Sequence, residues 1–340
     1  MNRKHFISSF IASAAVLSTI ETMASDAESD TSSFKIPPYL KPGDTVGITS
    51  PAGYITADQI QSSLLQIQSW GFTVQVGKTI GKRDFTYGGT DEERLSDFQS
   101  MLNNPAIKAI MCARGGYGFV RIIDQLDFSV FKKNPKWIIG FSDITVLHCH
   151  LAKNYRIASM HSKMCNSFPD DWTKADSTQI ETILSIKNAL IGEKMTYNAP
   201  FSPSNRLGKL EGILVGGNLS IMETLAGSNS DVDTQNKILF IEDTGEYLYS
   251  IDRMLWNLKR SGKLKKLKGL IVGGFKVKPD DAGEEFGKTI SEIVLEKVAE
   301  YNYPIAFDFP VGHQRNNFAL QCGVKHLLNV TENGTILRSL

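Results

Sequence analysis

The chain has 340 residues, of which 41% are hydrophobic and 21% are charged, a composition typical of globular proteins with room for two domains. Lys and Arg number 37 against 36 Asp and Glu, so the formal net charge is +1 and the basic surplus of most nucleic-acid-binding proteins is missing. The four cysteines stand singly, without a C-x-x-C pair, which favours buried thiols over disulfides or a metal site.

The first 30 residues have the layout of a secretory signal peptide. Arg3 and Lys4 precede an apolar stretch from about Phe6 to Ile20, and small residues follow it. The stretch is too short, and too often interrupted by Ser and Thr, for a stable membrane span. We therefore expect residues 1–30 to be a signal peptide and leader of an exported, periplasmic protein. A disordered extension on a cytoplasmic protein is the alternative, and no other segment is expected to enter a membrane.

Strands and helices alternate through residues 31–170. A threonine N-cap and acidic first-turn residues mark the start of the second long helix, at Thr90. Alternation of this kind is typical of a parallel sheet covered by helices, so we expect an N-terminal α/β domain here. The expected strands are 45–53 (with a turn at its end), 72–77, 107–113 and 136–141, and the expected helices are 57–71, 90–105, 118–126 and 143–154.

Residues 171–207 read as a linker region that contains one helix, 178–192, and a crossing rich in Pro, Ser and Asn. Residues 208–340 are expected to form a smaller, β-rich domain. The last two strands should be antiparallel, because only a few residues separate them. The expected strands are 209–218, 237–245, 267–275, 304–313, 318–330 and 334–339, and the helices are 218–227, 249–262 and 287–301.

Ser142 stands where a buried strand passes directly into a helix, in the stretch KWIIGFSDITVLHCH. At the carboxyl edge of a parallel sheet, a serine in such a turn is exposed and can act as a nucleophile, although the second glycine of G-x-S-x-G is absent. The alternative is a helix N-cap, a role that serine often fills.

A glycine-rich turn follows the strand at 107–113, in the stretch ARGGYG. Gly115 and Gly116 would let the main chain approach a ligand closely, and the helix expected after them favours an anion. Phosphate binding, an oxyanion site and a tight structural turn all fit this stretch.

Two more polar side chains follow strands of the second half. Glu242 and Asp243 end one apolar strand, and His313 lies in a glycine-flanked turn after another. Serine needs a base to accept its proton, and the base needs an acid to orient it, so Ser142, His313 and Glu242 form a candidate set. A metal site is disfavoured, because His148 and His150 would point about 200° apart on a helix.

These segments together resemble the LD-carboxypeptidases, serine peptidases that include muramoyl-tetrapeptide carboxypeptidase and the microcin C self-immunity peptidase. The resemblance rests on LKPGDTVGITSPAG, YGGTDEERLSDF, ARGGYGFVRIIDQLDF, IIGFSDITVLH, LEGILVGGNLSIMETLAG, ILFIEDTGEYLYSIDRMLWNLKRSGKL and VGHQRNNFALQCG, in this order. It implies a two-domain fold, with a nucleophile elbow in the first domain and the active site between the two. It also implies a homodimer without a cofactor.

The resemblance also assigns roles to residues. Ser142 would be the nucleophile, His313 the base and Glu242 its acid, with oxyanion donors at the N–H of Asp143 and of Gly116, or alternatively Gly115. Arg114 is a candidate for binding the free carboxylate of the substrate, or else a structural arginine that holds the glycine turn.

The implied reaction removes the terminal D-Ala from murein tetrapeptides. The alternatives are an immunity peptidase that cleaves a peptidyl-nucleotide antibiotic and a non-catalytic peptide-binding protein of the same fold. One departure affects the expected pocket: many relatives read HGPM where this chain has HSKM, so Ser162 and Lys163 replace Gly and Pro.

Overall fold

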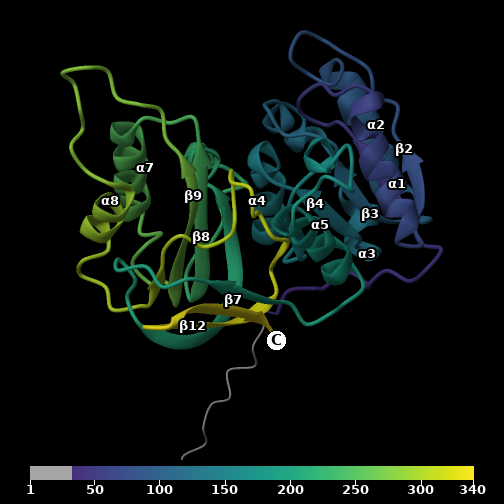
Figure 1. Cartoon of the computed structure of the whole chain (residues 1–340). Helices are drawn as coiled ribbons and strands as arrows, with labels where there is room; N and C mark the ends of the chain where they lie inside the picture. Colours follow the sequence, from purple (N-terminus) through teal and green to yellow (C-terminus); the bar gives the residue numbers. More distant parts are fainter. Residues whose placement is uncertain (1–32) are drawn as a thin grey trace, which may run out of the picture. The chain divides into compact units, whose positions relative to one another are not determined.

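The structure is a computed structural model that describes residues 33–340. Residues Phe34–Leu340 form one compact unit, which contains two β-sheets (Figure 1). The predicted signal peptide lies outside the described residues. No helix among residues 33–340 has both the length and the apolar character that crossing a bilayer requires.

The first sheet has six strands in the order β11-β5-β4-β3-β1-β2. The strands β1 to β5 are parallel, as predicted for the N-terminal half, and β11 joins them antiparallel from the other end of the chain. Their bounds are β1 Thr45–Thr49, β2 Thr73–Val76, β3 Ile107–Cys112, β4 Trp137–Gly140, β5 Ser159–His161 and β11 Leu320–Cys322.

Helices cover both faces of this sheet because its central strands are apolar on both faces. In β3, Ile110 and Cys112 belong to one buried cluster, with side chains of α2, α3 and α4. Ala109 and Met111 belong to the other, with α1 and α5. The bounds are α1 Gln61–Ser69, α2 Asp91–Asn103, α3 Ser129–Lys133, α4 Thr145–Asn154 and α5 Ser177–Leu190. The predicted Thr90 cap is confirmed, with Glu93 completing a capping box.

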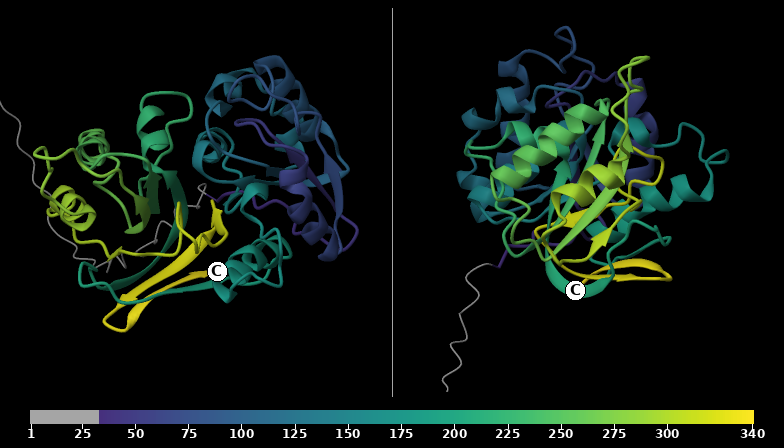
Figure 2. Two further views of the ribbon diagram at one scale, coloured as in Figure 1. Left: turned by 45° about the horizontal axis from the view of Figure 1, so that its top comes forward. Right: turned by 90° about the vertical axis from the view of Figure 1, so that its left-hand side faces the viewer.

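The second sheet has seven strands in the order β10-β9-β8-β7-β12-β13-β6. Strands β7 to β10 are parallel, whereas β12, β13 and β6 are antiparallel, and the predicted antiparallel pairing of the last two strands is confirmed. Figure 2 shows the β12–β13 hairpin in yellow, with α7 and α8 together on one side of the sheet. The bounds are β6 Thr196–Ala199, β7 Gly208–Asn218, β8 Lys237–Thr244, β9 Gly269–Lys276, β10 Ile305–Ala306, β12 Lys325–Thr331, β13 Gly334–Ser339, α6 Leu219–Thr224, α7 Leu248–Arg260 and α8 Ile290–Lys297.

Four expected elements differ from the structure. The helix expected at 118–126 is two 3-10 turns, Phe119–Arg121 and Ile123–Gln125, and the helix expected at 287–301 is only α8, which starts at its Thr289 capping box. The strand expected at 304–313 ends at Ala306, and Pro310, which lacks an N–H, lies in the irregular segment that follows. The strand expected at 318–330 breaks at Gly323, whose φ of +85° separates β11 from β12.

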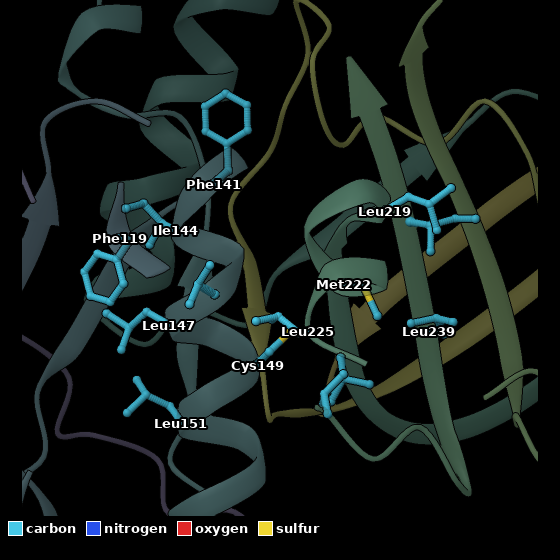
Figure 3. Close-up of a cluster of buried hydrophobic side chains, with 14 of the residues drawn as sticks. Phe119, Phe141, Ile144, Leu147, Cys149, Leu151, Leu219, Met222, Leu225 and Leu239 are labelled. Carbon is cyan, nitrogen blue, oxygen red and sulfur yellow. The ribbon is translucent and has the colours of Figure 1, made fainter. Parts of the chain in front are cut away.

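An apolar layer joins α4 to the second sheet. Figure 3 shows side chains from both parts of this cluster, among them Leu147 and Cys149 of α4 and Met222 and Leu225 of the α6 segment. At the top of the layer, β7 ends against the start of α4, where the Asn218 N–H donates to Thr145 Oγ1 at 3.1 Å. The turn that carries Ser142 therefore lies directly beside the second sheet.

Candidate active site

The turn between β4 and α4 holds Ser142 in a strained backbone conformation. Phe141 is extended, and Ser142 then has φ +62°, in the left-handed region. This region costs a residue with a Cβ about 1–2 kcal/mol, and such strain concentrates at functional sites. The side chain of Ser142 caps no helix: the N-cap position belongs to Phe141, which makes no side-chain cap bond either. The N-cap interpretation of Ser142 is therefore wrong.

The glycine loop packs directly against this serine. A Cβ added at Gly115 would lie 3.0 Å from Ser142 Cβ and 3.3 Å from Ser142 Oγ, so a larger residue here would crowd the serine. The adjacent Gly116 has φ +95°. Within residues 33–340, the N–H groups of Gly115, Gly116 and Asp143 donate to no acceptor. The loop and the serine turn therefore carry backbone donors that an oxygen of a ligand could use.

The carboxylate of Asp143 anchors the glycine loop. Its Oδ2 accepts a hydrogen bond from the Phe119 N–H at 2.8 Å, at the first residue after the loop. The side chain is almost fully buried, and this burial raises the pKa of Asp143 to about 6. Asp143 thus has two separate features: a structural carboxylate and an N–H that has no acceptor among the described residues.

Arg94 is a second anchor of the same loop, and the sequence analysis missed it. Its guanidinium is completely buried and donates to the carbonyls of Gly118 at 2.8 Å and Pro51 at 2.7 Å, and it pairs with Asp91. The sequence did contain a signal that Arg94 is buried. Arg94 and Phe98 are four residues apart in the predicted helix, so both lie on the same helix face. A charged residue on a buried helix face needs partners, and here the partners are loop carbonyls.

Glu242 and His313 form a close pair at the edge of the second sheet. Glu242 lies near the end of β8. Its carboxylate is fully buried and accepts from His313 Nδ1 at 2.6 Å and from the His313 N–H at 3.2 Å. The approach depends on Gly312, because a Cβ there would lie 2.4 Å from Glu242 Cβ. Since Nδ1 faces the acid, Nε2 is the ring nitrogen left for another group.

The imidazole also reaches the serine turn. The rings of His313 and Phe141 have centroids 4.9 Å apart, and Phe141 is the residue before Ser142. Within the described residues, Ser142 Oγ and His313 form no hydrogen bond. The structure therefore brings the predicted acid and base into direct contact and places their pair beside the predicted nucleophile.

Other residues considered in the sequence contact groups other than Ser142, Glu242 and His313. Arg114 is exposed and donates from Nη1 to the Tyr54 carbonyl at 2.9 Å. His148 lies between Ser159 Oγ and the Gly140 carbonyl, and its burial lowers its pKa to about 4. Among residues 33–340, no group of three or more His, Cys, Asp or Glu side chains is placed to hold a metal ion, and all four cysteines are free and buried.

Comparison with known proteins identifies the family. Residues 46–162 match the LD-carboxypeptidase N-terminal domain, and residues 211–328 match the LD-carboxypeptidase C-terminal domain. The chain belongs to the LD-carboxypeptidase family. This membership makes it a relative of carboxypeptidases, and it agrees with the two-sheet α/β architecture described above.

Individual LD-carboxypeptidase relatives align over most of their length. The chain is 33% identical to the probable murein peptide carboxypeptidase of Bacillus subtilis, covering 89% of this chain and 94% of that protein. It is 29% identical to the microcin C7 self-immunity protein MccF of Escherichia coli, covering 84% and 90%. The crystal structure of muramoyltetrapeptide carboxypeptidase from Oxalobacter formigenes superposes with a TM-score of 0.76 at 28% identity, covering 87% and 98%.

Proposed function

We propose that the protein is a serine LD-carboxypeptidase that releases the terminal D-Ala from murein tetrapeptides. The observation that carries the proposal is the Glu242–His313 hydrogen bond of 2.6 Å, located beside a serine with φ +62°. An acid–base pair beside a strained, half-buried serine is the arrangement that activates a hydroxyl for attack on an amide. The names of the murein carboxypeptidase relatives support the substrate class.

In the proposed mechanism, Ser142 Oγ attacks the carbonyl carbon that precedes the D-residue while its proton passes to His313 Nε2. Glu242 holds Nδ1–H, which fixes the tautomer and balances the imidazolium charge. The carbonyl oxygen becomes an oxyanion held by the N–H groups of Asp143 and of Gly116, or alternatively Gly115, each worth about 3 kcal/mol.

The tetrahedral intermediate then collapses, and the C–N bond breaks. The amine of the D-residue leaves with the proton held on His313, and the acyl group remains on Ser142. Water attacks this ester with His313 again as the base, which frees Ser142 Oγ and releases the tripeptide.

The test is incubation of the purified protein with a murein tetrapeptide, with D-Ala release measured for wild type and for Ser142→Ala. We expect release by the wild type and a loss of at least 1,000-fold in the variant, the scale seen when a triad serine is removed. Equal release by the Ser142→Ala variant would refute the nucleophile assignment.

The same assay includes an aminoacyl-adenylate analogue, because one relative is an immunity protein. Cleavage of that analogue without D-Ala release would support the immunity function. Turnover of neither, with tetrapeptide binding intact, would support a peptide-binding protein.

We also propose export to the periplasm and a homodimer. The signal-peptide pattern of residues 1–30 supports export, and family resemblance supports the dimer. Sequencing of the mature N-terminus tests the first, and an intact Met1 would contradict it. Light scattering in solution tests the second, and a monomer at micromolar concentration would contradict it.

A further inference from the structure

Lys163 lies beside the candidate active site. It is two residues past the end of β5, whose His161 pairs with Gly140 at the end of β4, so its loop neighbours the Ser142 turn. Its ammonium donates to the Gln314 carbonyl at 2.7 Å, directly after His313. It also lies 5.7 Å from the centre of the Phe141 ring. Lys163 therefore touches residues adjacent to both Ser142 and His313.

This ammonium has no ion-pair partner within residues 33–340. Two other lysines with a mostly buried side chain do have one, since Lys263 pairs with Asp231 and Lys259 with Glu300. Lys136, which is buried without an acidic partner, donates to two carbonyls, whereas Lys163 donates to one. Glu242 is the acid whose charge acts on Lys163, but that carboxylate is hydrogen-bonded to His313. A partly buried cation without a paired anion is costly, and it favours binding of an anion from outside the chain.

The surroundings of Lys163 have room for such an anion. A lysine ammonium has three donors, and only one is used, on Gln314. A cavity of about 400 Å³ opens beside it and contains a second cation, Arg315, which is exposed and pairs with Asp176. The cavity is lined by Lys163, Asn166, Ser167, Phe168, Gln179, Thr182, Ile183 and Arg315.

We propose that Lys163 binds the free C-terminal carboxylate of the peptide substrate. The inference rests on the proposed function, because a carboxypeptidase recognises a chain end that carries a negative charge one residue beyond the bond it cuts. Lys163 satisfies this need better than Arg114, whose side chain is exposed and whose Nη1 is engaged by the Tyr54 carbonyl. A charge-assisted hydrogen bond in a partly buried site is also stronger than one at the surface.

Binding measurements in the Ser142→Ala background test this without turnover. Calorimetry compares a murein tetrapeptide that ends in a free carboxylate with the same peptide as a C-terminal amide. We expect the carboxylate to bind about 10- to 100-fold more tightly, the effect of one hydrogen bond to a charged group. Lys163→Met should abolish this preference and leave amide binding within about threefold, whereas Lys163→Arg should retain most of it.

Two further variants separate charge at this site from charge in general. Lys174→Met removes an exposed lysine that pairs with Asp171 in the same region and should leave the preference unchanged. Arg114→Met should also leave it unchanged. A preference that survives Lys163→Met, that disappears in Arg114→Met, or that is absent from the Ser142→Ala protein would overturn the proposal. D-Ala release by the wild type decides the proposed function separately.

Discussion

At the scale of single residues, the backbone of Ser142 is the most specific feature of the site. Its φ of +62° lies in the region that glycine adopts readily and other residues adopt at a cost. A helix cap would need an extended backbone and a side-chain bond to the helix, and neither is present. Ser142 instead lies half-buried in the turn just after β4, with a backbone conformation that no cap requires.

The strain itself can be measured with two variants that both remove the hydroxyl. We expect Ser142→Gly to be more stable than Ser142→Ala, with a free energy of unfolding at least about 0.5 kcal/mol higher, because only glycine adopts this φ without strain. Urea denaturation followed by circular dichroism gives both values. Equal stabilities, or a more stable alanine variant, would show that the turn is relaxed in solution.

Asp143 predicts a pH dependence of stability. Burial raises its pKa from an ordinary 3.8 to about 6, so between these values the native protein retains a proton that the unfolded chain has released. Stability then falls as the pH rises through this window, by up to about 3 kcal/mol for this group.

The matched variant is Asp143→Asn, which keeps an acceptor for the Phe119 N–H but cannot ionise. Urea melts of both proteins from pH 4 to pH 7 should show the wild type losing stability relative to the variant. If the difference in free energy of unfolding between the two proteins stays constant from pH 4 to pH 7, or changes in favour of the wild type, Asp143 is not a buried ionisable carboxyl.

At the scale of elements, the turn after β10 determines how His313 meets Glu242. Gly312 has φ +102°, and an added Cβ would lie 2.4 Å from Glu242 Cβ. We expect Gly312→Ala to lower kcat by at least tenfold, because the histidine must move away from its acid. The effect is read from the rate of D-Ala release at saturating tetrapeptide.

Gly283→Ala is the control for this turn. Gly283 also has a positive φ, +83°, but an added Cβ would meet nothing within 4 Å. The Gly283→Ala protein should therefore have comparable backbone strain at the substituted position but the same kcat as the wild type. A Gly312→Ala protein as active as the control would mean that the close approach is not required.

Most elements could be predicted from the sequence because their apolar patterns are strong. The β3 strand is apolar on both faces, and Thr90 marks the start of α2 with its cap. The misses concern features that depend on tertiary contacts. The strand expected around Gly323 breaks at the positive φ of that residue, and Phe34, from the other end of the described chain, packs so closely that an added Cβ would lie 2.4 Å from its ring.

At the scale of the whole described unit, the site depends on how the second sheet packs against α4. Gly217 of β7 lies so close that a Cβ would be 2.6 Å from both Cγ2 and Oγ1 of Thr145. We expect Gly217→Ala to lower the free energy of unfolding by about 2 kcal/mol or more and to reduce kcat, since Thr145 follows the Ser142 turn. Urea melts and D-Ala release measure the two effects.

Gly245→Ala serves as the comparison for Gly217→Ala. Gly245 ends the neighbouring strand with φ +80°, and an added Cβ would have open space around it. Its loss of stability should be smaller and its kcat unchanged. If both variants behave alike, the packing of β7 on α4 does not position the serine.

The candidate residues were predictable because each follows an apolar strand, where a parallel sheet gathers its functional side chains. The contact between Glu242 and His313 spans 71 residues; the chemistry of the two residue types suggested it, and family resemblance supported it. Lys163 was noted only as a departure in the expected pocket, and Arg94 was missed despite its place on a buried helix face. Their partners could not be predicted, because the sequence does not show that these cations contact carbonyls of other loops, at Gln314 and Gly118.

The most direct test of the central claim is covalent labelling of the serine by a fluorophosphonate, followed by intact-mass measurement and peptide mapping. We expect one label per chain, located on Ser142, absent in Ser142→Ala and formed at least 100-fold more slowly in His313→Ala. A label on another residue, or an unchanged rate in the His313→Ala protein, would contradict it.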